Sequence, residues 1–149
     1  MSGLRRVTAA LVPELEVSDL AASLAFYRDV LGFRVRYERP EERFAYLERE
    51  GAELMLEEAA GPGRRFHTAP LERPFGRGVN LQIRVGDAKG LLERAGAAGA
   101  SIVIDLETRW YGQGLQEAGN LQFVVADPDG YLLRVFEDLG TRPATASPG

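Results

Sequence analysis

The residues of this chain that could do chemistry are mainly carboxylates and guanidinium groups. Cysteine is absent and His67 is the single histidine, so neither a thiolate nor a cluster of imidazoles is available as nucleophile or metal ligand. His67 lies in a segment rich in glycine and proline, and serine is scarce, so a nucleophile with its base and orienting residue is not found. We therefore expect no catalytic residues.

One arginine stands in an unusual place. The segment "DPDGYLLRVFE" (127–137) predicts a tight turn followed by a strand, and Arg134 lies inside that strand between Leu133 and Val135. Arginine does not lose its proton in proteins, so a fixed positive charge is expected among apolar neighbours. Its surroundings bear on whether the protein holds a metal ion or binds a ligand without chemistry.

The first half of the chain, about residues 9–59, predicts a βαβββ unit. The segment 11–17 alternates between apolar and polar residues, as a half-buried strand does. An amphipathic helix follows over 18–32, with Ser18 or Asp19 as its cap. Runs of alternating residues bounded by turn signals then predict three strands, at 33–39, 43–50 and 52–58.

The second half, about residues 78–138, repeats this order after a linker at 60–77. Asp87 stands at the start of its helix, as Asp19 does in the first half, and the repeat extends over the whole series of elements. The segment 107–120 is expected to be a loop between two strands, and 141–149 a flexible tail. The predicted fold class is α+β: two tandem βαβββ units within one domain (1–140), whose mixed sheets form a concave cleft.

Charge and composition limit the partners. The net charge of −4 argues against nucleic acid, because proteins that bind it usually carry a basic stripe. The apolar run near the N-terminus is too short for a signal peptide or a membrane span. The lack of cysteine suits a reducing compartment. We expect a cytoplasmic protein with no nucleic-acid partner and no membrane partner.

Three segments carry a resemblance to a known family. The residues "VSDLAASLAFYRDVLGF" (17–33), "VGDAKGLL" (85–92) and 127–137 resemble the vicinal oxygen chelate superfamily. This superfamily includes glyoxalase I, extradiol dioxygenases and the fosfomycin- and bleomycin-resistance proteins. The likeness extends over about residues 9–138 and implies the same fold of paired βαβββ units. Within the superfamily the chain looks closest to the bleomycin-resistance proteins.

The resemblance also implies where a metal ion would bind. The four ligand positions of metal-dependent members, usually histidine or glutamate, correspond here to Val12, Glu53, Asn80 and Arg134. A hydrocarbon, an amide and a cation cannot replace three such donors. We therefore expect no metal and no cofactor, with Arg134 at the vacated position and pairing with Glu53.

The expected ligand site combines aromatic and polar residues. Trp110, the single tryptophan, resembles the tryptophan of a tryptophan–glycine loop in bleomycin-resistance proteins, with Tyr111 inserted before the glycine. Tyr37 falls where those proteins carry a pocket aromatic. The residues expected to bind the ligand are Tyr37, Met55, Glu57, Trp110, Tyr111, Arg134 and Phe136. Two alternatives stay open: Trp110 can instead seal the core or a dimer seam, and Glu14, Glu16 and Arg84 can serve the cleft or an interface.

These observations favour a binding protein over an enzyme. The leading expectation is a homodimer that sequesters a cationic, partly aromatic small molecule, such as a bleomycin-like antibiotic, in its cleft without catalysis. One alternative is a metal-dependent lyase or isomerase of the glyoxalase or dioxygenase type that recruits its metal through Glu53. Another is a structural dimer held together by its acidic cleft.

Overall fold

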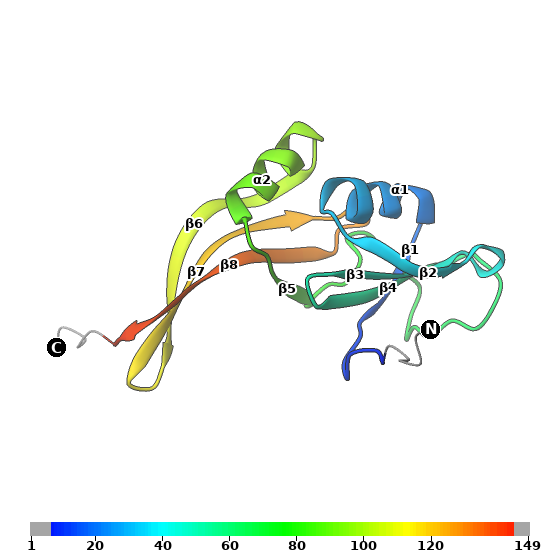
Figure 1. Cartoon of the computed structure of the whole chain (residues 1–149). Coiled ribbons are helices and arrows are strands. Elements are labelled where there is room, and N and C mark those ends of the chain that lie inside the picture. Colours follow the sequence, from blue (N-terminus) through cyan, green and yellow to red (C-terminus); the bar gives the residue numbers. More distant parts are fainter. Residues whose placement is uncertain (1–6, 145–149) are drawn as a thin grey trace, which may run out of the picture. The chain divides into compact units, whose positions relative to one another are not determined.

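A computed structural model of the chain describes residues 7–144 and divides into two compact units, which meet in the sequence between Pro70 and Leu71. Each unit holds a four-stranded mixed sheet and one helical segment (Figure 1). The predicted α+β fold of two tandem βαβββ units is confirmed. Among the described residues, no helix is long and apolar enough to cross a membrane.

The first unit has the sheet order β1-β4-β3-β2, with β1 parallel to β4 and the other pairs antiparallel. Its elements are β1 (Glu14–Val17), α1 (Leu20–Leu24) with a π-helical continuation (Ala25–Val30), β2 (Arg34–Arg39), a 3-10 turn (Pro40–Glu42), β3 (Phe44–Arg49) and β4 (Ala52–Glu58). The helix starts at Asp19, whose carboxylate accepts hydrogen bonds from the backbone N–H groups of Ala21 (3.0 Å) and Ala22 (3.3 Å). Tyr27 and Leu31 are almost fully buried and contribute to the core of this unit.

The second unit repeats this arrangement with the order β5-β8-β7-β6. Its elements are β5 (Asn80–Arg84), α2 (Ala88–Ala97), β6 (Ser101–Gln113), β7 (Gln116–Ala126) and β8 (Leu132–Pro143). Asp87 caps α2 by accepting a hydrogen bond from Gly90 N–H at 2.9 Å. The core of the unit contains Leu91 of α2 and the side chains of Phe123, Leu133 and Val135 in the sheet.

The turn before β8 has the structure that its sequence predicts. The carboxylate of Asp127 accepts hydrogen bonds from the backbone N–H groups of Asp129 and Tyr131, each at 2.9 Å. Gly130 has a φ of +100°, which a residue with a side chain rarely adopts, and a Cβ there would lie 2.6 Å from Pro74. This turn fixes the start of β8 and hence the position of the residues that follow it.

The prediction of a loop at 107–120 is wrong. Strands β6 and β7 continue through this segment as a long hairpin, closed by Gly114 and Leu115 (Figure 1). Gly119 is a ladder residue opposite Trp110, and its missing side chain makes room for the indole ring, because a Cβ there would lie 2.7 Å from ring atoms. Gly119 is therefore a packing feature of a strand.

The first residues of the predicted tail belong to a strand. Residues 141–143 belong to β8 and pair with the segment 116–118 of β7. The remainder of the predicted tail, residues 145–149, lies outside the described residues. Similarly, the predicted linker is divided between the units, because residues 60–70 belong to the first unit.

Candidate ligand-binding site

A cavity of about 330 Å³ lies on the sheet of the second unit. Successive residues of a strand point to opposite faces, so Leu133 and Val135 enter the core while Arg134 and Phe136 point to the other face. The register places Gln82 of β5 beside Arg134. The residues that line the cavity are Gln82, Tyr111, Gln113, Ala118, Asn120, Arg134, Phe136 and Asp138.

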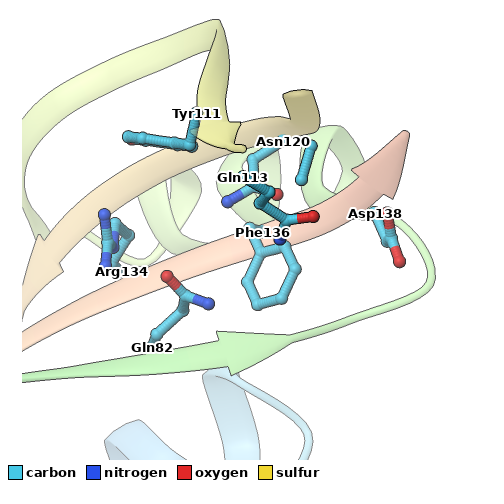
Figure 2. Close-up of a pocket in the computed structure, with 8 residues that line it drawn as sticks. Gln82, Tyr111, Gln113, Asn120, Arg134, Phe136 and Asp138 are labelled. Carbon is cyan, nitrogen blue, oxygen red and sulfur yellow. The ribbon is translucent and has the colours of Figure 1, made fainter. Parts of the chain in front are cut away.

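Figure 2 shows how these side chains are arranged. Arg134, Gln82 and Tyr111 lie at one end of the cavity and Asp138 at the other, with the ring of Phe136 between them. The guanidinium of Arg134 lies 5.9 Å from the centroid of the Tyr111 ring, within the range of a cation–π interaction. The cavity therefore offers two aromatic rings, amide groups and one cation.

The Tyr111 ring is held by a buried hydrogen-bond network. Its hydroxyl accepts a hydrogen bond from Nε2 of Gln122 at 2.8 Å, and the same nitrogen donates to Glu107 at 3.1 Å. Gln122 is only 3% exposed, and its Oε1 accepts from the Asn120 amide at 3.4 Å. The network fixes the orientation of the ring beside the cavity before any ligand binds.

The guanidinium of Arg134 is not satisfied by its neighbours. Within residues 7–144, its buried Nε has no hydrogen-bond partner. The residues beside it in the ladder are Gln82 on β5 and Val124 on β7, and neither carries a negative charge. A buried N–H without an acceptor is unfavourable, so a ligand that supplies an acceptor would bind with extra free energy at this point.

Trp110 lies on the other face of the hairpin. Adjacent strand residues point in opposite directions, so Trp110 and Tyr111 cannot both face the cavity. The indole packs against Gly119, and the Arg142 guanidinium lies 3.8 Å from the indole ring centroid while forming an ion pair with Glu117 at 2.9 Å. Of these two predicted site residues, Tyr111 lines the cavity, whereas the packing of Trp110 matches the alternative in which it has a packing role.

The three other predicted site residues, Tyr37, Met55 and Glu57, lie in the first unit. Tyr37 is 44% exposed and stacks on Tyr46, with ring centroids 5.1 Å apart, and Phe44 lies next to it at 6.1 Å. Met55 is opposite Tyr46 in the ladder and thus on the same face. Tyr37, Phe44 and Tyr46 form an aromatic cluster on the sheet of the first unit, in which only Tyr37 is exposed.

Glu53 is engaged within its own unit. Its carboxylate forms an ion pair with Arg36 at 2.9 Å and accepts a hydrogen bond from the Tyr46 hydroxyl. Burial and the adjacent Glu53 carboxylate raise the pKa of the Tyr46 hydroxyl, so it stays a donor. Its arginine partner within the first unit is Arg36, which the sequence did not single out. The expected pairing of Glu53 with Arg134, which belongs to the second unit, stays a prediction.

The first part of the predicted linker contributes residues that sequence reasoning missed. Arg65 forms an ion pair with Glu57, and its Nη2 also donates to the backbone oxygens of Glu58 (2.8 Å) and Glu42 (3.3 Å). Nδ1 of His67 lies 2.7 Å from the Glu16 carboxylate. The signal that could have found them is the basic stretch 64–67, which follows two strands that each present several glutamates.

These ion pairs reduce the negative charge that the sequence predicts on the sheet of the first unit. Glu16, Glu53 and Glu57 all have basic partners in their own unit, so little uncompensated negative charge remains. Burial, and then the charges of Glu57 and Glu16, raise the pKa of Glu14, which shows that some repulsion persists there. Of the residues whose role the sequence left open, Glu16 therefore forms an ion pair inside the unit, with His67 when that ring is protonated.

The four positions at which the family resemblance implies metal ligands do not fit a divalent ion. Val12 offers no donor, Asn80 offers an amide, and Arg134 brings a positive charge. Glu53, the one carboxylate, is already bound to a cation and a hydroxyl. Across the described part of the chain, no group of three or more histidine, cysteine, aspartate or glutamate side chains could hold a metal ion.

Comparisons with known proteins agree with the fold. A family model described as the glyoxalase/bleomycin resistance protein/dioxygenase superfamily matches residues 9–135. A superfamily member from Vibrio splendidus 12B01 is 42% identical over 86% of this chain and 97% of its own, with a TM-score of 0.38. No curated protein is significantly similar in sequence.

Two solved structures illustrate the likeness in three dimensions. TioX from Micromonospora sp. ML1 is 23% identical over 88% of this chain and 100% of its own, with a TM-score of 0.65. A protein of unknown function from Agrobacterium tumefaciens str. C58 is 26% identical over 93% and 98%, with a TM-score of 0.63. The paired βαβββ units and the match over residues 9–135 show that the chain belongs to the glyoxalase/bleomycin resistance protein/dioxygenase superfamily.

Proposed function

We propose that the chain binds a small, partly aromatic molecule without catalysis, in the cavity of the second unit, and thereby sequesters it. The observation that carries the proposal is the cavity itself, which combines the rings of Tyr111 and Phe136 with a buried guanidinium N–H. Its volume of about 330 Å³ is at the lower end of the range for small-molecule sites. Sequestration requires affinity only.

The lining residues support binding over catalysis. The amides of Gln82, Gln113 and Asn120 orient a ligand but do not exchange protons near neutral pH. The superfamily includes enzymes and resistance proteins on one fold, so function has to be argued from the site. A metal-dependent lyase or isomerase lacks support here because the residues at the expected ligand positions do not fit a metal ion.

The geometry gives little support to the expected positive charge of the ligand. Attraction of a cation was expected from acidic residues, yet Glu53 and Glu57 pair with Arg36 and Arg65. The aromatic part of the expectation has better support, because Tyr111 is held in place by Gln122. A bleomycin-like antibiotic stays a candidate ligand, because its flat rings can stack on an aromatic side chain such as Tyr111.

Thermal unfolding in the presence of metal-free bleomycin tests the proposal. A ligand that binds only the folded state at a hundred times its Kd adds about 2.7 kcal/mol to the free energy of unfolding. We expect Tyr111→Ala to abolish this gain. The matched control Thr108→Ala, at an exposed position on the opposite face of β6, should retain it. A gain that survives in Tyr111→Ala would place the site elsewhere, and no gain at all would refute bleomycin as ligand.

Two further parts of the proposal concern the assembly and its location. We propose that the chain acts as a homodimer, in which cleft formation between copies enlarges the binding surface, and that it acts in the cytoplasm. Analytical ultracentrifugation with and without bleomycin tests the first part. Fractionation of the native cell tests the second.

A further inference from the structure

Arg134 is the single cation among the described residues that line the cavity. Its Nε is buried and, among residues 7–144, lacks a hydrogen-bond acceptor. A guanidinium keeps its proton in proteins, so the side chain remains a donor. The side chain therefore keeps both an unsatisfied donor and a positive charge at one end of the cavity.

The acidic residues of this face do not neutralise the guanidinium. Asp138, the one acidic residue in the described lining, lies four positions further along β8, roughly 13 Å away in an extended strand. Its Oδ1 accepts a hydrogen bond from Gly140 N–H at 2.8 Å. Glu107, on β6, accepts from the buried Gln122. Neither carboxylate therefore serves as the acceptor for Arg134.

The surroundings of Arg134 favour a particular kind of negative group. The Tyr111 and Phe136 rings provide apolar surface next to the guanidinium, and Gln82 is its neighbour across the ladder. A guanidinium presents its N–H groups as a planar fork that matches a carboxylate with two parallel hydrogen bonds. A phosphate would bring a second negative charge, for which the described lining offers no second cation.

We propose that the ligand of this cavity is an aromatic monocarboxylate, whose carboxylate binds the Arg134 guanidinium while its ring packs between Tyr111 and Phe136. The inference rests on the proposed function, because it assigns a ligand class to the same cavity. It reverses the ligand charge that the acidic sequence favoured. The reason is that Glu53 and Glu57 of the first unit have basic partners there, whereas the buried Nε of Arg134 has no acceptor among the described residues of its own unit.

Three probes of nearly equal shape distinguish an anionic ligand from a neutral or a cationic one. Benzoate, benzamide and benzamidine carry a negative, a neutral and a positive group on the same ring. Isothermal titration calorimetry gives their affinities, and the ¹H–¹⁵N signals of the arginine Nε groups report contact with Arg134. A hydrogen bond to a charged group is worth enough to favour benzoate over benzamide by roughly tenfold to a hundredfold. Benzamidine should bind most weakly, and benzoate should shift the Nε signal of Arg134.

Two variants assign the effect to the residue. Arg134→Gln should weaken benzoate binding by roughly the same factor and leave benzamide binding within about twofold. Arg84→Gln is the matched control, because Arg84 is an exposed arginine on the parallel partner strand of the same sheet, outside the cavity lining. It should leave both affinities unchanged. Equal losses in the two variants would indicate a general charge effect and overturn the inference.

The remaining outcomes distinguish this inference from the proposed function. Tighter binding of benzamidine, or benzoate binding that survives Arg134→Gln, would overturn the carboxylate assignment and leave sequestration intact. If none of the three probes binds while bleomycin still stabilises the protein through Tyr111, the carboxylate assignment is likewise overturned and sequestration stays intact. Failure of bleomycin as well would remove both proposals. Dissociation of a dimer by Arg134→Gln would show that a carboxylate of a second copy pairs with Arg134, which also contradicts the inference.

Discussion

Removing Arg36 should strongly destabilise the first unit. Arg36 and Glu53 form an ion pair at 2.9 Å with side chains that are only 11% and 9% exposed, so water screens the pair little. In Arg36→Met the Glu53 carboxylate loses its Arg36 partner and stays buried with hydrogen bonds from the Tyr46 hydroxyl and the Ala9 N–H. Removing one partner of a buried ion pair in this way costs about 3–5 kcal/mol.

The loss can be measured by urea or thermal unfolding followed by circular dichroism. For a chain of this size, each kcal/mol lowers the midpoint by about 2–4 °C, so a decrease of at least about 6 °C is expected. The double variant Arg36→Met, Glu53→Met should recover most of the loss, because it removes both charges and retains apolar volume.

An exposed ion pair provides the control. Arg28 and Asp29 also lie 2.9 Å apart, but their side chains are 49% and 59% exposed. Arg28→Met should therefore change the free energy of unfolding far less than Arg36→Met does. A cost of Arg36→Met as small as that of the control would refute the assignment of Glu53 to a structural ion pair, and would make it available again as a ligand for a metal or substrate.

Three other predictions follow from single contacts. Gly119→Ala should cost about 1–3 kcal/mol, because its Cβ would lie 2.7 Å from the Trp110 ring, whereas Gly112→Ala has open space around it and should be nearly neutral; unfolding curves compare the two variants. Glu14→Gln should raise the stability at pH 7 by a few tenths of a kcal/mol. Burial and the charges of Glu57 and Glu16 raise the pKa of the Glu14 carboxyl, so this group destabilises the fold once it ionises. The gain in stability should therefore vanish near pH 3, below the usual glutamate range. An unchanged gain at pH 3 would contradict this explanation. Zinc or nickel should not bind with one-to-one stoichiometry in equilibrium dialysis, because the four expected ligand positions lack a suitable donor set; saturable binding at one ion per chain would be inconsistent with this view.

Much of the fold could be predicted because its signals are local. Asp19 and Asp87 cap helices through their own backbone neighbours, and the alternation of apolar residues gives the strands their faces. The turn at 127–130 is likewise fixed by short-range hydrogen bonds and a glycine with positive φ. Such features depend on residues a few positions apart, so they can be predicted from the sequence without the tertiary structure.

The candidate site was only partly predictable. Alternation from the turn correctly places Arg134 and Phe136 on one face of β8, and the cavity lies there. Trp110 was assigned to the ligand site because it was expected in a loop, whereas it lies in a strand and packs on Gly119 across the ladder. Tyr111, from the same segment, lines the cavity as predicted. Distinguishing a binding role from a packing role requires knowledge of what Gly119 contacts across the ladder.

The sequence by itself determined the order of the elements, the family fold and the poor metal donor set. Only the tertiary structure decided which charges meet: Glu53 with Arg36, Glu57 with Arg65 from a segment expected to be a plain linker, and Arg134 with no acidic partner among the described residues of its own unit. The physical reason is that periodicity and capping act over a few residues, while an ion pair depends on strand register and on the path of distant segments. The electrostatic character of the cavity therefore could not be obtained from the count of acidic residues.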